Sequence, residues 1–284
     1  MCFSRNRHIK RTTESEEKKL QVSILAVVAL SLLLASCGLE SATGGADAAS
    51  GTYQEIETGY PLKQIAVSEG KRWALTADNE VLAAENGKED FRCVRKIEGI
   101  YSGTDGFVNV CFVDAQTAYA AYFSEDERSV VVERTSDGGE SWEQTSLVYG
   151  DYGEVCDAGS VYLSFFDDEN GYIGVSYHGE DSYLYRTENA GAEWRSEKLP
   201  VQDESISYID GYAPVFYGEN GAGMIVLKAV GESASYRLFL TEDYGAAWKA
   251  AGELPLESVQ GYAADGAGRL LFIDGMGKLY ERVG

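Results

Sequence analysis

The sequence predicts an all-β protein, and three observations lead to this fold class. A short pattern, Thr-x-Asp-x-Gly-x-x-Trp, returns at regular intervals along the chain. Segments of four to eight residues rich in Val, Tyr, Phe and Ile are separated by Gly, Asp, Asn and Glu. No apolar stripe of helical period runs longer than two turns. Short strands with turns between them favour a sandwich, a barrel or a propeller, and the repeat selects the β-propeller.

The repeated pattern has three clear copies and one degenerate copy. In the degenerate copy, AAENGKEDF, Asn86 takes the Asp position and Phe91 takes the Trp position. From Phe91 the aromatic positions follow at intervals of 51, 52 and 54 residues. Such a period predicts stacked copies of one supersecondary unit. The residues of the clear copies are Thr135, Asp137, Gly139, Trp142, Thr187, Asn189, Gly191, Trp194, Thr241, Asp243, Gly245 and Trp248.

Each residue type of the pattern has a structural role. The Gly permits a positive φ in a tight turn, and the Asp or Asn accepts hydrogen bonds from turn amides. The Thr ends a strand, and the Trp is expected to pack into the seam between blades. A residue type that recurs in every blade serves the blade, so we do not expect these acids to be catalytic.

Residues 1–36 are expected to be an export signal rather than part of the fold. A basic start precedes the apolar run 22–34, which leads directly into Ala35-Ser36-Cys37. The run is shorter than the roughly 20 residues that a transmembrane helix needs, although an uncut signal anchor is the alternative. The ending Leu34-Ala35-Ser36-Cys37 resembles the lipobox of bacterial lipoproteins. That resemblance implies cleavage before Cys37 and a lipid on the Cys37 sulfur.

Residues 37–51 are small and polar without periodicity, so we expect a flexible tether after the lipidated Cys37. Residues 52–284 then form the propeller. The strands expected in the first four repeats lie at 63–67, 72–76, 80–84, 90–96, 107–113, 118–123, 129–135, 141–148, 161–166, 172–177, 183–187, 193–199, 213–217, 223–230, 236–241 and 247–254.

The last part of the chain, residues 258–284, holds only three expected strands. The N-terminal segment TYQEIETGYPL supplies the missing fourth strand, with Tyr53 in the Trp position. We therefore expect five four-stranded blades, closed by pairing of the N-terminal strand with the last blade. Closure of this kind satisfies edge groups that an open ring leaves exposed. Four or six blades are the alternatives.

The repeated pattern resembles the Asp-box, or bacterial neuraminidase repeat, of sialidase-like propellers. The motif Phe-x-Asp-x-x-x-Gly-Tyr (Phe165, Asp167, Gly171, Tyr172) is also similar to propellers of photosystem II assembly factors. The resemblance implies that the Asp-boxes lie between third and fourth strands, on the face away from the functional pocket. It covers sialidases, other glycosidases, sorting receptors and assembly scaffolds, so it does not fix an activity.

A sialidase is disfavoured, because that family needs three arginines on one substrate carboxylate. Arg134 and Arg186 precede Asp-box turns, and Arg72 and Arg269 lie near turns of the same face, so Arg128 and Arg237 are the arginines left for the other face. A glycosidase with two carboxylates remains the alternative enzyme, since it needs only two acids at a set distance.

Cofactor chemistry is sparse in the sequence, and no cofactor is expected. His178 is the single His after residue 36, which excludes a His-rich zinc site. A calcium site is conceivable at Asp167, Asp168 and Glu169, although they lack an EF-hand pattern. Cys93, Cys111 and Cys156 are an odd number, so at least one stays unpaired or links chains. Cys111 with Cys156 is the best candidate disulfide, and a buried, unpaired Cys111 is the alternative.

The loops opposite the Asp-boxes alternate tyrosines and acids. A binding face is one interpretation, because Tyr offers area plus a hydroxyl and loops on a rigid scaffold carry function. Solvated loops on an acidic protein are the other interpretation. The candidate ligand-binding residues are Tyr101, Asp105, Asp151, Tyr152, Glu154, Tyr208 and Asp210.

The charge excludes some partners. The chain carries −22, and loss of residues 1–36 removes six Lys or Arg and three Asp or Glu, giving −25. Such a field repels nucleic acid and favours cationic partners or Ca²⁺. We expect an extracytoplasmic protein, anchored to the cell membrane by lipid, that acts as a non-catalytic binding or scaffold module for a surface protein or glycan. A glycosidase and a purely structural cell-envelope protein are the alternatives.

Overall fold

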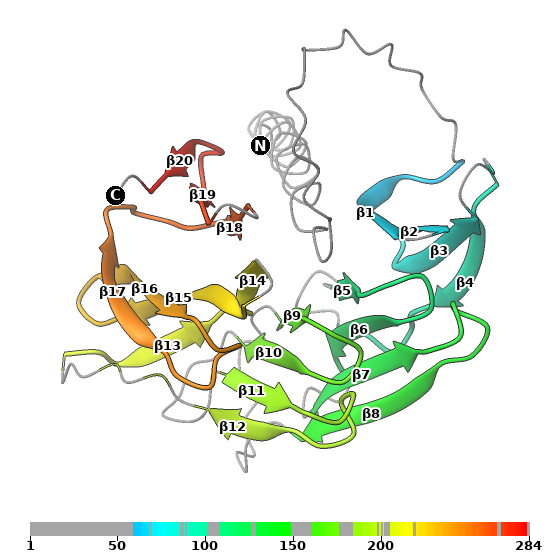
Figure 1. Ribbon diagram of the computed structural model, residues 1–284, viewed down its shortest axis with the longest axis horizontal. Helices are drawn as coiled ribbons and strands as arrows, with labels where there is room; N and C mark the ends of the chain where they lie inside the picture. Colours follow the sequence, from blue (N-terminus) through cyan, green and yellow to red (C-terminus); the bar gives the residue numbers. More distant parts are fainter. Residues whose placement is uncertain are drawn as a thin grey trace, which may run out of the picture.

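The computed structural model describes residues 59–282, except 69, 86–87, 89, 102–107, 126–128, 149–160, 176–183, 198, 200, 202–204, 218–219 and 266–267. This part of the chain contains twenty strands and no helix, and accordingly no helix in it is long and apolar enough to span a membrane. The strands form five antiparallel sheets arranged around a common centre (Figure 1). The predicted five-bladed β-propeller is confirmed.

Each blade is a meander of successive strands. The first sheet contains β1 (Leu62–Ser68), β2 (Lys71–Thr76), β3 (Glu80–Glu85) and β4 (Arg92–Lys96). The second contains β5 (Asn109–Phe112), β6 (Ala118–Phe123), β7 (Ser129–Thr135) and β8 (Glu143–Val148). The third contains β9 (Val161–Phe165), β10 (Gly171–Val175), β11 (Leu184–Thr187) and β12 (Arg195–Glu197).

The fourth sheet contains β13 (Tyr208–Gly211), β14 (Val215–Tyr217), β15 (Ala222–Val230), β16 (Ala234–Thr241) and β17 (Lys249–Leu254). The fifth contains β18 (Gly261–Ala264), β19 (Leu270–Ile273) and β20 (Leu279–Glu281). In Figure 1, β5, β9, β14 and β18 lie nearest the centre, and β8, β12 and β17 lie at the outside.

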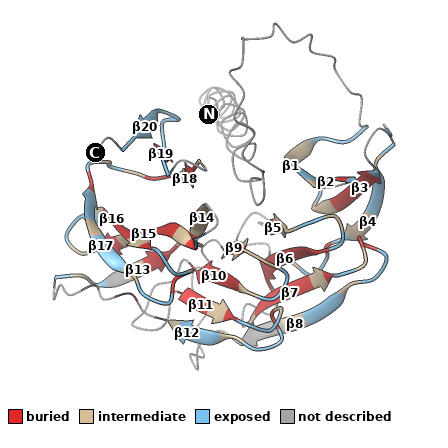
Figure 2. Cartoon of the chain, in the orientation of Figure 1, coloured by how far each residue is buried: buried red, intermediate tan, exposed pale blue. Residues whose placement is uncertain are grey.

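The core lies in the seams between blades. Successive side chains of a strand point to opposite faces of its sheet, so the side chains of a middle strand pack into the seams on both sides of the blade. On β15, Met224 and Val226 pack between the fourth and fifth blades, whereas Ile225 and Leu227 pack between the third and fourth. The seams between the first three blades hold two further clusters of the same kind. Burial is therefore concentrated in the middle strands (Figure 2), which explains why strands such as β6, β10 and β15 are largely apolar.

The fifth sheet has three strands in the described part of the chain, and β20 is exposed along its whole length. In Figure 1 the first and fifth sheets stand at the two ends of the series of blades. The strand expected to close the ring begins at Tyr53, and residues 52–58 lie outside the described residues. Closure by the N-terminal strand therefore stays a prediction.

The fourth blade differs from the sequence prediction at its innermost strand. A single strand over 213–217 was expected, but two short strands, β13 and β14, share one edge of β15. Gly211 faces Leu227 while Val215 faces Met224, so three residues, 212–214, stand against two on β15. This extra residue is a β-bulge, which bends a strand and redirects its side chains. Sequence reasoning missed this bulge because it placed Pro214 inside a single strand, 213–217.

Candidate functional site

The three turns of the repeated Thr-x-Asp-x-Gly-x-x-Trp pattern, called Asp-box turns here for their resemblance to that motif, share one hydrogen-bond pattern. In the second blade, Thr135 Oγ1 donates to Asp137 Oδ1 at 2.8 Å and accepts from the Gly139 amide at 2.9 Å. The Ser141 amide donates to Asp137 Oδ1 at 3.0 Å. Corresponding bonds recur around Asn189 and Asp243 at 2.7–3.0 Å. Because a neutral Asn fills the same position, the turn needs an acceptor oxygen and not a charge, which supports a structural role.

The residue before each Asp-box glycine fastens the turn to its own blade. Gly138, Ala190 and Tyr244 have φ values of 75°, 58° and 54°. Their amides donate to the carbonyls of Gln116, Glu169 and Gly221 at 2.8, 2.7 and 2.9 Å, respectively. Those carbonyls belong to the turn between the first and second strands of the same blade. The two hairpin turns of each blade therefore meet on one face, here called the Asp-box face.

The three Asp-box tryptophans lie in the seams, as their pattern predicts. Trp142 packs on the cluster between the first and second blades, Trp194 on the next cluster, and Trp248 on the cluster between the third and fourth blades. The indole nitrogens are buried and have no hydrogen-bond partner. These side chains thus contribute area and shape rather than polar contacts.

Aromatic residues at the start of the second strands join each blade to the next. Trp73 Nε1 donates to Asp114 O at 2.9 Å, Tyr119 Oη to Asp168 O at 2.6 Å, and Tyr172 Oη to Tyr244 O at 3.0 Å. Burial raises the pKa of Tyr119 to about 12 and raises that of Tyr172 as well. These hydroxyls therefore stay protonated and donate at neutral pH.

The arginines of the Asp-box face are engaged with these rings. The Arg134 guanidinium lies 5.9 Å from the Tyr119 ring centroid, and the Arg186 guanidinium lies 5.5 Å from that of Tyr172. Arg72 lies in the same way over Phe91, at 5.3 Å. These contacts fix the three cations away from one another in separate blades, which opposes a shared carboxylate clamp. Arg128 lies outside the described residues, and Arg237 lies on β16.

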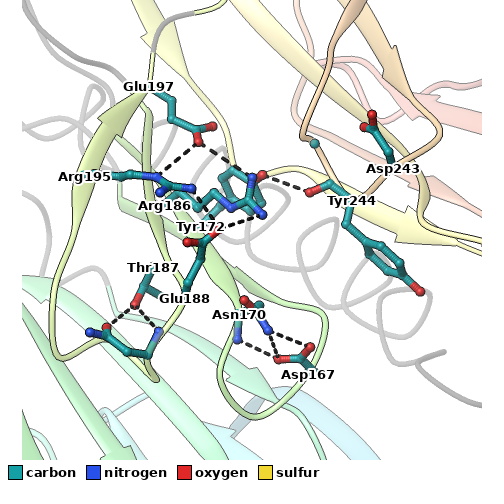
Figure 3. A network of polar contacts seen from close by, with 12 residues as sticks. Asp167, Asn170, Tyr172, Arg186, Thr187, Glu188, Arg195, Glu197, Asp243 and Tyr244 are labelled. Carbon is teal, nitrogen blue, oxygen red and sulfur yellow. Dashed lines mark hydrogen bonds and ion pairs between the residues drawn. The ribbon is translucent and has the colours of Figure 1, made fainter.

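Figure 3 shows a network of polar contacts around the third blade. Arg186 reaches Glu188 at 3.2 Å and Glu197 at 3.8 Å, and Arg195 reaches the same two carboxylates at 2.8 and 3.8 Å. Burial raises the pKa of Glu197, against the opposing effect of both arginines. A raised pKa suits a general acid. However, Glu197 stands on the outermost strand between two guanidinium groups, so the geometry fits an ion-pair network that braces β11 and β12.

The candidate calcium ligands at the third blade's first turn have structural partners. Asp167 Oδ1 accepts from the amides of Glu169 and Asn170 at 2.9 and 2.6 Å, and Oδ2 accepts from Asn170 Nδ2 at 2.9 Å. Within the described residues there is no group of three or more His, Cys, Asp or Glu side chains placed to hold a metal ion. The Asp167 carboxylate stabilises its turn.

Cys111 lies on β5, where its sulfur bridges to the third blade. The Phe165 amide donates to Cys111 Sγ at 3.4 Å, and Sγ lies 3.8 Å from Phe165 O. Cys93 on β4 is exposed and carries no disulfide. Cys156 and His178 lie outside the described residues, so the proposed pairing of Cys111 with Cys156 stays a prediction.

The face opposite the Asp-boxes, here called the loop face, is the one on which the candidate ligand residues were expected. Tyr101 is half-buried against the seam of the second and third blades, and its amide donates to Phe123 O at 3.0 Å. Asp210 is only 7% exposed on β13, and Tyr208 begins that strand. Asp105, Asp151, Tyr152 and Glu154 lie outside the described residues. The structure thus brings Tyr208 and Asp210 to one strand, and Asp210 is buried, which does not fit the interpretation of these residues as solvated loop positions.

Sequence reasoning missed the partner of Asp210. Lys228 stands opposite Asp210 in the β13–β15 register, with its Nζ 3.3 Å from Asp210 Oδ2. The Asp210 Oδ1 atom is buried and has no hydrogen-bond partner. A single Lys inside the apolar strand AGMIVLKAV was the signal available in the sequence, since a buried Lys needs a counter-charge.

Tyrosines from three blades meet beside this pair. The Tyr212 ring lies 4.7 Å from that of Tyr162 on β9 and 6.1 Å from that of Tyr262 on β18. Tyr262 Oη donates to Ala213 O at 2.6 Å, and Tyr212 Oη donates to Val259 O at 3.2 Å. Burial is the largest cause that raises the pKa of Tyr212, and neighbouring tyrosines and Asp210 add to it.

Comparison with solved structures supports the fold alone. A GH74 xyloglucanase from Xanthomonas campestris is 14% identical, with a TM-score of 0.51 over 76% of this chain and 36% of that one. An oligogalacturonate lyase from Vibrio parahaemolyticus is 8% identical, with a TM-score of 0.50 over 76% and 64%. YCF48 bound to D1 peptide is 15% identical, with a TM-score of 0.46 over 81% and 67%. No protein-family model and no curated protein matches the chain.

Proposed function

We propose that this protein is a non-catalytic binding or scaffold module, held on the outer side of the cell membrane by a lipid on Cys37. Its ligand is a surface protein or a glycan, taken up at the loop face. The tether 37–51 would keep the propeller a short distance from the membrane. This combination suits a protein that presents one face to partners on the cell surface.

One observation carries the proposal: the three longest connections of the propeller belong to the loop face. They join β4 to β5 (97–108), β8 to β9 (149–160) and β12 to β13 (198–207). The Asp-box turns in contrast span seven residues each, at 136–142, 188–194 and 242–248. The long connections differ in sequence from blade to blade; each contains acids, and 149–160 alternates them with tyrosines. Variable loops on a rigid scaffold are where binding residues concentrate.

The polar groups of the Asp-box face support the same division of labour. Asp137, Asn189 and Asp243 are occupied by turn amides and by the Thr hydroxyls of their motifs. Arg134 and Arg186 are occupied by tyrosine rings. The polar groups of the Asp-box face therefore stabilise the fold, and the loop face is the one proposed for recognition.

The alternative is a glycosidase with paired carboxylates, and its strongest support is the pair Glu188 and Glu197. A retaining enzyme needs two carboxyl groups about 5–5.5 Å apart, one of them with a raised pKa. Glu197 meets the second condition. Both groups are bridged by the same two arginines on the outer strands, however, so a sugar would have to displace two guanidinium groups before it could react.

The test is a cross-linking capture from intact producing cells with the tagged, lipidated protein at low and high salt. A matched variant, Asp151→Asn with Glu154→Gln, weakens the charge of the loop face. Glu242→Gln serves as the control, because it removes an exposed ion pair between Glu242 and Lys249 on the Asp-box face. The proposal expects one dominant ligand that the loop variant loses and the control retains. A basic protein ligand should also dissociate at high salt.

The contrary result has two forms. If wild type and the loop variant capture the same ligands, the loop face does not carry recognition. If a captured glycan is hydrolysed by the purified protein, and Glu197→Gln abolishes the hydrolysis, the glycosidase is correct and the non-catalytic module is wrong.

A further inference from the structure

A break in the innermost strand of the fourth blade stands beside the buried Asp210. The bulge at 212–214 interrupts the innermost strand of the fourth blade, which the other described blades keep continuous. The bulge is pressed against the third blade, because a Cβ on Gly174 of β10 would collide with the backbone of Tyr212 and Ala213. A glycine at such a close approach is required by the neighbouring backbone. The third and fourth blades are therefore shaped around this bulge.

The bulge places Tyr212 between the tyrosines of two other blades. Tyr162 on β9 and Tyr262 on β18 stand on its two sides. Both strands are the first of their blades and lie near the centre in Figure 1. A bulge next to a site redirects a side chain, and here it turns one ring into the region where three blades meet. The bulge therefore places the rings of Tyr162, Tyr212 and Tyr262 next to one another near the centre of the propeller.

Beside these tyrosine rings, Asp210 and Lys228 pair with each other but do not use all of their hydrogen-bond acceptors and donors. Lys228 Nζ contacts Asp210 Oδ2 at 3.3 Å, and the two side chains are 30% and 10% exposed. Asp210 Oδ1 is buried without a partner. Buried polar atoms are nearly always hydrogen-bonded, so an unsatisfied carboxylate oxygen requires an explanation. An ammonium group has three donors, more than a single carboxylate oxygen accepts.

The pair therefore offers an acceptor and a donor side by side, at no net charge. A cationic ligand would gain little there, because Lys228 already neutralises Asp210 and would repel it. An anionic ligand would face the unpaired Oδ1. A neutral ligand with adjacent hydroxyls fits this pair, since one hydroxyl can donate to the Asp210 carboxylate and its neighbour can accept from the more exposed Lys228 Nζ. Tyrosine rings add apolar area beside such polar groups.

We propose that Asp210, Lys228, Tyr212 and Tyr162 form a subsite for a neutral sugar residue of a glycan. The inference rests on the proposed function and narrows its ligand from a surface protein or glycan to a neutral glycan. One terminal sugar would reach the Asp210 pair between the third, fourth and fifth blades.

The test titrates the full-length protein with cellohexaose, xylohexaose, mannohexaose and chitohexaose. Sialyllactose and an oligolysine peptide serve as anionic and cationic comparators. Binding is followed by calorimetry and by tyrosine and tryptophan fluorescence. At least one neutral oligosaccharide should bind, and Asp210→Asn should weaken it by about tenfold or more, because a hydrogen bond to a charged group is lost. Glu242→Gln, which breaks an exposed ion pair on the Asp-box face, should leave the affinity unchanged.

Loss of binding counts only if the variant is folded, so the denaturant midpoint of each variant is measured alongside. Lys228→Gln is the second variant: it removes the charged donor and should also weaken binding. The proposal is overturned if no neutral oligosaccharide binds, if both variants bind as wild type does, or if oligolysine binds and competes. Unchanged cell-surface capture by Asp210→Asn would remove the subsite but keep the binding module. Hydrolysis of the bound sugar would keep the subsite but remove the non-catalytic function.

Discussion

Arg95 on β4 donates two hydrogen bonds to Glu133 on β7, across the seam between the first and second blades. Arg95 Nε lies 2.6 Å from Glu133 Oε2, and Nη2 lies 2.7 Å from Oε1. Glu133 is 1% exposed, and Tyr122 Oη donates to its Oε1 at 3.0 Å. The carboxylate is thus satisfied by partners from both blades. This pair helps to fix how the first two blades face each other.

Arg95→Ala should destabilise the protein by about 2–4 kcal/mol, because it leaves Glu133 buried without a cation. The value lies toward the low end of that range because the Arg95 side chain is 37% exposed. Urea unfolding followed by circular dichroism measures the loss. Lys96→Ala is the control: its contact with Glu80 is 3.9 Å long and mostly exposed, and such pairs contribute about 0–1 kcal/mol. Equal midpoints for the two variants would contradict a role for the bidentate pair.

Trp194→Ala should lower the denaturant midpoint sharply, with a loss of about 3–5 kcal/mol. The indole meets Phe165 edge-on at a centroid distance of 6.1 Å and packs on the seam of the second and third blades. Trp194→Phe should lose much less, because the indole nitrogen has no hydrogen-bond partner to give up. An unchanged midpoint for Trp194→Ala would show that the seam does not depend on this side chain.

Gly245→Ala should be more damaging than Gly191→Ala, although the two glycines occupy the same position of the motif. Their φ values are 81° and 83°, so both variants carry the backbone strain of about 1–2 kcal/mol. A Cβ at Gly191 makes ordinary contact with Trp194 at 3.4 Å, whereas one at Gly245 collides with the Tyr172 hydroxyl. We expect a further 1–3 kcal/mol or so for Gly245→Ala from that overpacking. Thermal unfolding of the matched variants tests the order, and equal losses would mean that backbone strain alone decides.

The repeat made the fold predictable from sequence. The spacing of Trp142, Trp194 and Trp248 set the blade period, and most strands lie where the alternating pattern put them. The pattern worked because each blade uses the same hydrogen bonds from Thr and Asp side chains, which are local in sequence. A local hydrogen-bond pattern that repeats can be recognised in the sequence without knowledge of tertiary contacts.

The candidate site was only partly predictable, because its contacts are not local. Asp210 was selected as an acid in a loop, but its pairing with Lys228 depends on the register of β13 against β15. That register depends in turn on the bulge at 212–214, where Pro214 was the local signal available, because proline inside a strand marks an edge or a bulge. The meeting of Tyr162, Tyr212 and Tyr262 joins residues from three blades. Such convergence follows from the arrangement of the blades around a common centre, which one strand's sequence does not encode.

Asp137 should make the protein sensitive to acid. Hydrogen bonds from Ser141, first from its hydroxyl and then from its amide, and from Thr135 lower the pKa of Asp137 below its ordinary value of 3.8. The unfolded state then binds more protons than the folded state, so stability rises with pH in this range. The contribution is complete above the unfolded pKa of about 3.9 and is lost as the pH falls through the lower folded value.

Asp137→Asn keeps the acceptor oxygen, as Asn189 does in the third blade, but cannot titrate. Urea midpoints measured between pH 6 and pH 3 should therefore fall less steeply in the variant than in wild type. Asp78→Asn is the control, since Asp78 lies in the exposed turn between β2 and β3. If Asp137→Asn and wild type lose stability in parallel, the lowered pKa does not contribute to acid sensitivity.

Cys37→Ala should release the protein from the membrane if residues 34–37 direct lipidation. Two or more acyl chains give stable anchoring, whereas a chain without lipid has no equivalent attachment. Phase partition in detergent, applied to cells that produce each form, should move the variant from the detergent phase to the aqueous phase. Mass spectrometry of the N-terminal peptide should show a lipid on Cys37 in wild type only. Cys93→Ala is the matched control, because it removes an exposed cysteine of the propeller and should leave partition unchanged. A Cys37→Ala protein that stays in the detergent phase would favour an uncut signal anchor over the lipid.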